Sequence, residues 1–414
     1  MNKMKKGYKR TEIGVIPEEW EIVSLKSLCS VPMQNGVFYK PSSKGKGVRL
    51  VNVGDLYRTT PIDVENLELF DATDYEKKCF KIENGDLFFT RSSVVPSGIA
   101  HCNIYQKIRS ECIVFDSHVI RVRPDFRKVD AHFLYRFCLS KVARTYLVAH
   151  SKTATMTTID QGVLGKCQVF LPTKKEQKAI AEVLSDTDNL IQALEKRIAK
   201  KRLIKQGAMQ KLLTPKDDWD VKKLGEIADV KSGKRLPLGK SLTDKQTPYP
   251  YVRILDMNEG GISLKDIKYV PKEVFPSIKN YRIFKNDIYI SVAGTLGLVG
   301  RIPEVLDGAN LTENANKITN IKCNVDYLHI ILKSDLIQNK IDAERTLGAQ
   351  PKLALIRIRN FEIPLPPLGE QTHIATILSD MDSEIEALEK KLAKYQQLKQ
   401  GLMQNLLTGK IRLI

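Results

Sequence analysis

The chain has 414 residues, of which 42% are hydrophobic; this is enough for two or three domains with ordinary cores and argues against wholesale disorder. The formal net charge of +18 indicates a polyanionic partner, with nucleic acid as the first candidate and a generally basic, solvated surface as the alternative. No apolar run reaches the roughly 18 to 20 residues of a membrane span, and no apolar stretch of a secretory signal follows the basic leader MNKMKKGYKR. We therefore expect a cytoplasmic protein with no membrane partner.

The seven cysteines are scattered and form no Cys-x-x-Cys pair, which is typical of reduced thiols in a cytosolic protein. The six histidines are dispersed as well, without the spacing of metal ligands. We expect no metal site.

Two segments of about 150 residues share a strand-rich pattern. Each opens near one of the two tryptophans, Trp20 in IPEEW and Trp219 in PKDDW. Further on, residues 84–90 (NGDLFFT) parallel residues 285–291 (KNDIYIS), and in both a turn signal precedes a short apolar run. Because the frame is shared while the loops differ, we expect two domains that do the same kind of job on different targets.

Each segment is followed by a predicted long helix. Residues 171–214 recur at 365–408 without a gap, with about 25 of roughly 44 positions identical, which marks an internal repeat with a period of about 194 residues. Apolar residues step by four and three along both copies, and this spacing predicts a coiled-coil seam on a helix of about 33 residues, roughly 50 Å long. The predicted seam residues are Ile180, Leu184, Ile191, Leu194, Ile198, Ile374, Leu378, Ile385, Leu388 and Leu392.

These patterns predict an α+β fold. Two mixed, strand-rich domains would be separated by two long helices packed as an antiparallel coiled coil, with an internal pseudo-two-fold repeat and the globular segments at opposite ends. The expected division is a first domain with the basic leader at 1–170, a central long helix at 171–214, a second domain at 215–364, and a distal long helix with the C-terminal tail at 365–414.

The motifs of an active site are missing. Gly239-Lys240-Ser241 has the tail of a phosphate-binding loop, but Lys234 stands where the first glycine is required. There is no glycine-rich dinucleotide fingerprint, and no Asn-Pro-Pro-Tyr tetrapeptide of the kind with which adenine methyltransferases hold a flipped base. We expect a chain without catalytic residues of its own.

Several short motifs together resemble one family over essentially the whole chain. Each long-helix copy begins with Leu-Pro followed by Glu-Gln and later carries Leu-Ser-Asp and Lys-Gln-Gly, and the chain has Leu-Leu-Thr-Gly-Lys near its end. With the leader from Tyr8 to Trp20, these motifs resemble the specificity (S) subunit of type I restriction–modification systems. One departure is Thr173-Lys174-Lys175, where the second copy has Pro367-Leu368-Gly369. The matching motifs begin at Leu171, Glu176, Leu184, Lys205, Leu365, Glu370, Leu378, Lys399 and Leu406.

The resemblance implies two target-recognition domains joined by the family's two conserved helices. Two methyltransferase (M) subunits would dock around the helices, and a restriction (R) subunit would be a further partner. S-adenosylmethionine and ATP would bind to those partners, so the chain itself would hold no cofactor and would be a non-catalytic subunit bound to double-stranded DNA. Two different domains on one rigid spacer would read two separated half-sites, so the target would be asymmetric and bipartite.

The predicted DNA contacts lie in loops of the two segments. The basic loops SSKGKGVR and KSGKR, taken as matching places, are predicted mainly as phosphate contacts, with Arg49 and Arg235 as candidates for base contacts. Arg91 could donate two hydrogen bonds to guanine, worth about 1 to 3 kcal/mol of discrimination. An ordinary solvated loop residue is the alternative for each member of the set, which comprises Lys44, Lys46, Arg49, Arg91, Ser92, Ser93, Lys152, Thr153, Thr155, Lys231, Lys234, Arg235, Ser291, Thr295, Gln350 and Lys352.

Two other functions stay open at this point. A lone S-like chain that binds DNA or a regulatory partner without directing methylation would share these features, and a neighbouring methyltransferase gene would argue against it. A stand-alone methyltransferase fused to its own recognition domains is disfavoured by the short length and by the missing base-binding tetrapeptide. S-adenosylmethionine binding by the isolated chain would support that second alternative.

Overall fold

A computed structural model describes residues 6–38, 41–58, 60–106, 111–259, 261–343 and 352–413. The chain forms two compact units: unit 1 comprises residues 1–195 and 390–414, and unit 2 comprises residues 196–389. Both boundaries fall inside a long helix, so each unit contains the start of one long helix and the end of the other. Because the units are not consecutive in sequence, the expected division into four consecutive segments stays a prediction.

Unit 1 is built around a four-stranded antiparallel sheet, in the order β4 (Gln34–Asn35), β11 (Val119–Val122), β7 (Leu87–Thr90) and β9 (Cys102–Ile104). A second sheet joins β10 (Ile113–Phe115), β5 (Lys44–Val51) and β6 (Glu68–Phe70), with β10 parallel to β5. The remaining strands form a small sheet and two pairs: β12 (Lys152–Thr153), β13 (Thr157–Thr158) and β8 (Ser92–Ser93); β14 (Gln168–Leu171) with β3 (Glu21–Ser24); and β1 (Tyr8–Thr11) with β2 (Gly14–Pro17). The helices are α1 (Asp74–Phe80), α2 (Ala131–Cys138), α3 (Lys141–Ala149), α4 (Gln161–Gly165) and the first part of α5 (Lys174–Leu212).

Unit 2 repeats this arrangement. Its four-stranded sheet has the order β16 (Asp229–Ser232), β25 (Ala315–Thr319), β22 (Ile288–Ser291) and β23 (Val299–Arg301). The second sheet has the order β20 (Lys268–Tyr269), β17 (Pro250–Val252), β24 (Ala309–Leu311) and β21 (Arg282–Ile283), and again one pair, β17 with β24, is parallel. The other elements are β15 (Asp220–Lys223) paired with β26 (Glu362–Leu365), β18 (Met257–Asn258) paired with β19 (Gly261–Ile262), and the helices α6 (Leu224–Ile227), α7 (Phe275–Ile278), α8 (Val325–Lys333), α9 (Asp335–Ala343), α10 (Leu355–Arg359) and the first part of α11 (Leu368–Leu406).

The central strand of each unit has a hydrophobic core on both faces. In β7, Leu87 and Phe89 lie in the main core of unit 1, and Phe88 between them lies in a second core. In β22, Ile288 and Ile290 likewise lie in the main core of unit 2, with Tyr289 in a second core. Because side chains alternate across a strand, a strand between two cores needs an unbroken apolar run, which is what the sequence provides.

The turn before each central strand is held by an aspartate. Asp86 Oδ2 accepts a hydrogen bond from the backbone N–H of Glu83 (2.7 Å), and Asp287 Oδ2 accepts one from the backbone N–H of Phe284 (3.0 Å). The matched turn and strand that the sequence predicts at residues 84–90 and 285–291 are therefore confirmed.

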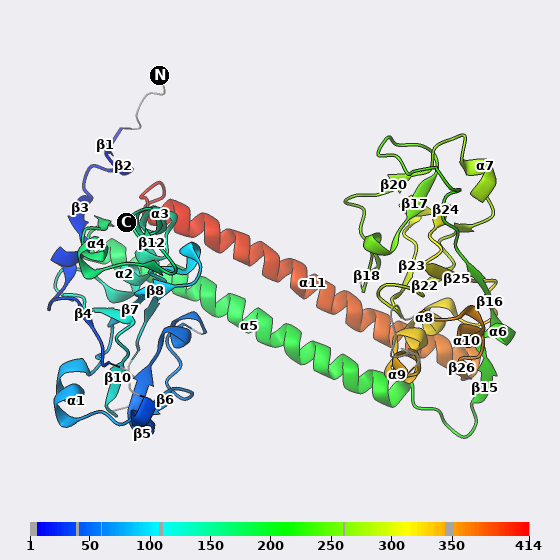
Figure 1. The fold of residues 1–414 in the computed structure, drawn as a ribbon, viewed down its shortest axis with the longest axis horizontal. Coiled ribbons are helices and arrows are strands. Elements are labelled where there is room, and N and C mark those ends of the chain that lie inside the picture. The colour runs from blue at the N-terminus through cyan, green and yellow to red at the C-terminus, as the bar shows by residue number, and fades with distance from the viewer. Residues whose placement is uncertain are drawn as a thin grey trace. The chain divides into compact units, whose positions relative to one another are not determined.

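The helices α5 and α11 have 39 residues each. Figure 1 shows both as unbroken ribbons. They exceed the predicted length of about 33 residues because each starts directly after the Leu-Pro segment and runs to the leucines near its end. In unit 2, Lys201 pairs with Glu384 (2.7 Å) and Lys205 with Asp382 (2.5 Å), so residue numbers rise on one helix as they fall on the other. This confirms antiparallel packing of the helix segments within that unit.

The predicted seam residues have two environments. Ile180 and Leu184 belong to the main core of unit 1 together with Leu406, the last residue of α11, and Leu407, which follows it. Ile374 and Leu378 belong in the same way to the main core of unit 2. The middle of the seam lies outside these cores: Ile191, Leu194, Ile198 and Ile385 are buried, and Leu388 and Leu392 are half-buried.

Candidate nucleic-acid interface

In unit 1 the structure brings two of the predicted loops together. β8 pairs with β13, and β13 pairs with β12, so that Ser92, Thr158 and Lys152 lie side by side across three strands. The exposed Arg91 precedes β8, and its backbone N–H donates to the His118 carbonyl (2.8 Å). Arg91, Ser92 and Lys152 line one cavity of about 470 Å³, which we call the unit 1 cavity.

The other predicted residues of these two loops lie on the same small sheet or its turn. Ser93 pairs with Thr157 across the strands, and the Thr153 and Thr157 hydroxyls are 3.2 Å apart. Thr155 is exposed in the turn between β12 and β13. Ser93, Thr153 and Thr155 therefore lie next to the unit 1 cavity but do not line it.

The unit 1 cavity also contains residues that the sequence did not single out. His118, His150, Thr158 and Asp160 contribute to its lining. His118 follows a buried aspartate, Asp116, by two residues, and this Asp-x-His spacing directly before a strand is the one local signal that could have found it. A polar cavity with two histidines and two cations can both attract an anion and form directional hydrogen bonds.

The basic residues of β5 face acidic partners. Lys44 pairs with Glu68 (2.5 Å) and Lys46 with Asp71 (3.0 Å), and both lysine side chains are more than half exposed. Such exposed pairs are worth at most about 1 kcal/mol, so a DNA phosphate can compete for these lysines.

Arg49 is held more firmly than the two lysines. Its Nε donates to Glu111 Oε1 (3.0 Å), and its Nη1 donates to the Glu65 carbonyl (2.9 Å). Two of its donor groups are thus engaged within the protein, which weighs against Arg49 as a base reader.

In unit 2, Lys234, Arg235 and Lys352 line a cavity of about 590 Å³, which we call the unit 2 loop cavity. Arg235 Nε pairs with Glu313 (3.0 Å), and Lys234 Nζ lies 5.7 Å from the centre of the Tyr281 ring. These three predicted residues therefore come together. Lys231 lies outside this lining and pairs with Asp229 (3.0 Å), and Gln350 falls outside the described residues.

The assumed match between SSKGKGVR and KSGKR is wrong. β16 pairs with β25 as β4 pairs with β11, so Gly233 corresponds to Gly36, and β5 corresponds to β17. A Cβ at Gly36 would lie 1.8 Å from the Phe115 carbonyl oxygen, and one at Gly233 would lie 2.0 Å from the Thr312 carbonyl oxygen. The shared glycine is fixed by close backbone approach, whereas the basic residues near it misled the alignment.

Ser291 is a structural residue rather than a DNA contact. It is fully buried, its hydroxyl donates to the Thr295 carbonyl (2.5 Å), and it accepts from the Leu298 backbone N–H (2.8 Å). In unit 1, Thr90 occupies the matched position with equivalent bonds, to Gly98 (3.0 Å) and from His101 (2.9 Å). A hydroxyl with both functions satisfied inside the fold has none left for a base. The exposed Thr295 remains a candidate.

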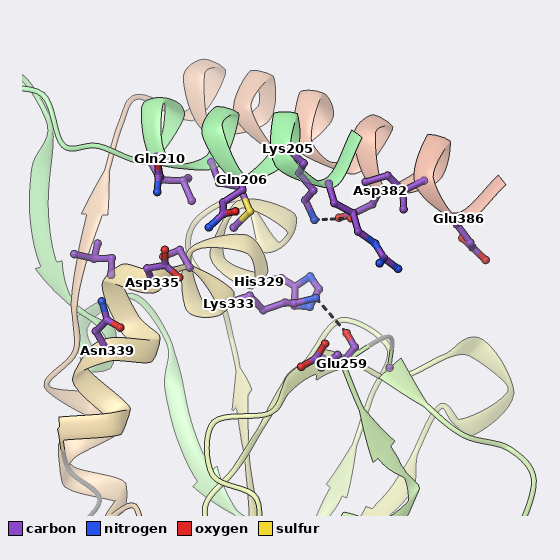
Figure 2. Close-up of a pocket in the computed structure, with 18 of the residues that line it drawn as sticks. Lys205, Gln206, Gln210, Glu259, His329, Lys333, Asp335, Asn339, Asp382 and Glu386 are labelled. Atoms are coloured by element: carbon purple, nitrogen blue, oxygen red, sulfur yellow. Dashed lines mark hydrogen bonds and ion pairs between the residues drawn. The ribbon is translucent and has the colours of Figure 1, made fainter. Parts of the chain in front are cut away.

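A larger cavity of about 1070 Å³ lies within unit 2, lined by parts of α5, α8, α9 and α11, and we call it the helix cavity. Figure 2 shows Lys205 paired with Asp382, and Lys333 reaching the Glu259 carbonyl (3.2 Å) beside His329. Burial lowers the pKa of His329 to about 4 and also lowers the pKa of Lys333.

Charges of both signs, amides and apolar groups alternate along the helix cavity, among them the pair Arg202–Glu389 (2.6 Å), Gln206 and Leu213. This mixed lining suits a polypeptide segment better than a small ion. Among the described residues, no group of three or more His, Cys, Asp or Glu side chains is arranged to hold a metal ion. None of the helices in the described part of the chain combines the length and apolarity of a membrane span.

The sequence matches the family model described as the type I restriction modification DNA specificity domain twice, over residues 17–202 and 216–400. The chain therefore belongs to this family of DNA specificity subunits. The predicted fold class and the main predicted function, a DNA sequence specificity subunit, are confirmed by this double match.

Named relatives agree with the family. The chain is 28% identical over 430 residues to the provisionally named type I restriction enzyme MjaX specificity subunit of Methanocaldococcus jannaschii, covering 98% of this chain and 96% of that protein. It is 26% identical over 301 residues to the MjaVIII specificity subunit of the same organism, covering 67% of this chain and 70% of that protein. The fold is also similar to that of a type I restriction–modification S subunit from M. genitalium, with a TM-score of 0.56, 18% identity, and coverage of 94% and 96%.

Proposed function

We propose that this chain directs a type I restriction–modification complex to an asymmetric, bipartite DNA target, with one half-site read by each unit. The observation that supports this most is a repeated scaffold with different side chains at matched positions. Arg91 in unit 1 is matched by the buried Val292 in unit 2, and His118 by Asn314, as the strand registers define. Two equal frames with unequal reading surfaces suit two different half-sites.

In this proposal the exposed cations divide into two kinds of contact. Lys44 and Lys46 on β5 hold phosphates, which adds affinity but no sequence preference. Arg91 with Lys152 in the unit 1 cavity, and Lys234 with Arg235 in the unit 2 loop cavity, lie among polar groups that can contact base edges.

The same proposal has M subunits docked along α5 and α11, where each helix leaves many charged side chains exposed. The helix cavity of unit 2 offers paired charges and apolar groups to a polypeptide segment of such a partner. Methyl transfer and any ATP-driven step then belong to the partners, and this chain contributes recognition alone.

Charge reversal tests the docking. Lys333→Glu places a third carboxylate beside Asp382 and Glu259, so we expect co-purification with the M subunit to weaken at least tenfold. Lys272→Glu, an equal change at an exposed residue outside the cavity lining, should leave co-purification unchanged. Equal behaviour of the two variants would remove the cavity from the interface.

A genome-wide methylation map tests the proposed function itself. The chain is co-expressed with its neighbouring M subunit in a host without adenine methylation, and modified bases are mapped. We expect a split, asymmetric motif that disappears when this chain is omitted. If both subunits associate and no motif is methylated, the chain is a DNA-binding or regulatory homologue rather than a targeting subunit.

A further inference from the structure

The segment from Asp116 to His118 is locked between the two sheets of unit 1. The Asp116 backbone N–H donates to the Val51 carbonyl (3.0 Å), and the Ser117 backbone N–H donates to the Val37 carbonyl (2.8 Å). The Asp116 side chain is 7% exposed and the His118 side chain is 58% exposed. The two residues before His118 are therefore buried and held by backbone hydrogen bonds, whereas the His118 imidazole is accessible to a ligand.

Asp116 fixes the orientation of this imidazole. Its Oδ1 accepts from the His118 backbone N–H (2.7 Å) and lies 2.9 Å from His118 Nδ1. Because an ionised carboxylate only accepts, Nδ1 carries the proton of the neutral ring, and Nε2 keeps a lone pair. No hydrogen bond to Nε2 occurs among the described residues, so this acceptor is available.

Within the unit 1 cavity, His118 is an acceptor whose orientation is fixed by a buried carboxylate, that of Asp116. Arg91 and Lys152 are donors only. Asp160 is also an acceptor, but one of its carboxylate oxygens, Oδ1, caps α4 by accepting from the Val163 backbone N–H (2.8 Å). His150 stacks on Tyr146 with the ring centres 4.1 Å apart, and its Nδ1 lies 2.9 Å from the Tyr146 carbonyl.

We infer that His118, oriented by Asp116, is a specificity-determining residue that accepts a hydrogen bond from an exocyclic amino group of one base in the half-site of unit 1. This inference rests on the proposed function of unit 1 as a DNA-reading domain. In the major groove, adenine N6 and cytosine N4 are amino donors, whereas the guanine and thymine edges offer acceptors. An acceptor at Nε2 therefore favours adenine or cytosine at that position, with Arg91 and Lys152 holding nearby groups of the same DNA.

Unit 2 lacks this device at the matched place. Thr312 and Asn314 stand where unit 1 has Asp116 and His118, and the Asn314 backbone N–H approaches the Thr312 hydroxyl at 3.4 Å. The local turn is repeated without an oriented imidazole. The half-site read by unit 2 therefore serves as an internal control in any experiment on His118.

The test is the methylation map repeated with His118→Asn, which introduces the residue found at the matched position of unit 2, and with His118→Gln, whose longer side chain can bring an amide oxygen close to the place of Nε2. We expect His118→Asn to relax one position of one half-site by about tenfold, admitting guanine or thymine, while the other half-site keeps its preference. His118→Gln should retain more of the preference than His118→Asn. The ring is exposed, so neither change removes core packing.

Three results overturn the inference or the function beneath it. Methylation that falls uniformly over all sites makes His118 a phosphate contact. A motif unchanged in both variants gives His118 no role in reading. If the unmodified chain yields no bipartite motif, the proposed function itself fails. Binding of the isolated chain to duplexes that vary only at the relaxed position gives the same discrimination without the M subunit, so loss of assembly cannot mimic the expected result.

Discussion

The two units anchor their tryptophans differently. In unit 1, Trp20 Nε1 donates to Glu176 Oε2 (3.0 Å), and Glu176 is fully buried. Arg412, from the segment after α11, pairs with both oxygens of that carboxylate (2.6 and 2.9 Å) and lies 5.7 Å from the Trp20 ring centre. The hydrogen bonds to Glu176 and Glu19 raise the pKa of Arg412, so this cation stays charged.

In unit 2 the same set is looser. Glu370, at the position of Glu176, is 28% exposed and pairs with the largely exposed Lys216 (2.5 Å), whose Nζ lies 5.7 Å from the Trp219 ring centre. No acceptor among the described residues lies within hydrogen-bonding distance of the buried Trp219 Nε1. The same part of the repeated fold is thus stabilised by a buried charged network in unit 1 and by an exposed ion pair in unit 2. Two units with similar sequences can therefore differ in the interactions that stabilise them.

The largest expected effect comes from breaking this network. Arg412→Ala leaves a buried carboxylate without its cation and should lower the free energy of unfolding of unit 1 by roughly 3 to 5 kcal/mol. Lys216→Ala removes only an exposed ion pair and should cost unit 2 much less. With Trp219→Phe or Trp20→Phe as background, the remaining tryptophan reports one unit in denaturant titrations. Equal costs in the two units would contradict the comparison.

The second largest expected difference between the units is in how their stability changes at acid pH. His329 of unit 2 and Tyr135 of unit 1 both lie five residues after the N-cap of matched helices, Asn324 and Asp130. Burial lowers the pKa of His329 to about 4, against its usual 6.5, and raises the pKa of Tyr135 to about 12. Between pH 6.5 and about pH 4, His329 is protonated in the unfolded state but not in the folded state. The stability of unit 2 therefore falls as pH falls through this range, while Tyr135 stays neutral throughout.

We expect unit 2 to lose roughly 2 kcal/mol between pH 6.5 and pH 4 from this residue, after allowance for the partial exposure of its ring. His329→Gln should flatten that part of the curve. The measurement is denaturant unfolding at a series of pH values with Trp219 as reporter. An unchanged slope in His329→Gln would show that other groups cause the acid sensitivity.

A smaller loss of stability, equal in the two units, is expected at the buried hydroxyl that both units share. Ser291→Ala and Thr90→Val each remove a buried hydroxyl that donates and accepts one hydrogen bond, and each should cost about 1 to 2 kcal/mol. The methylated motif should not change in either variant. A changed motif in Ser291→Ala would restore this residue as a DNA contact.

The smallest effects concern phosphate contacts. Lys46→Ala in unit 1 and Lys231→Ala in unit 2 should each weaken DNA binding a few-fold for every sequence, and each should reduce the slope of log affinity against log salt by about one. Binding titrations at several salt concentrations measure both quantities. A loss confined to one base sequence would instead make the lysine a base reader.

Local patterns predicted much of this molecule. The long helices and the matched turn and strand depend on spacing over a few residues, and the repeat is visible as identity between two long segments, so all three are readable from one sequence. Arg91 and Lys152 were predicted as DNA contacts from their loops, and this stays a prediction; nothing in the sequence shows that β13 joins the two loops beside one cavity. The sequence-based predictions were wrong where they relied on composition without knowledge of the topology: the basic KSGKR was matched to the wrong loop, and buried Ser291 was taken for a surface residue.

The rest depends on contacts between distant residues. Arg412 and Trp20 are far apart in the chain, and no periodicity or motif indicates that a terminal arginine completes the first tryptophan's environment. His118 matters through the burial of Asp116, which follows from two sheets meeting at that turn. Such properties arise from tertiary packing, so they appear only with the fold.

Unit 1 combines residues from the beginning and from the last part of the chain, and this has a consequence for biosynthesis. Leu406, Leu407 and Arg412 belong to the core or the buried network of a unit whose other residues are synthesised first. As the ribosome proceeds from the N-terminus, the first recognition domain is made early, yet it waits for its last side chains until all of unit 2 has been translated. A nascent chain halted after Glu389 would carry all residues of unit 2 but would lack part of the core of unit 1.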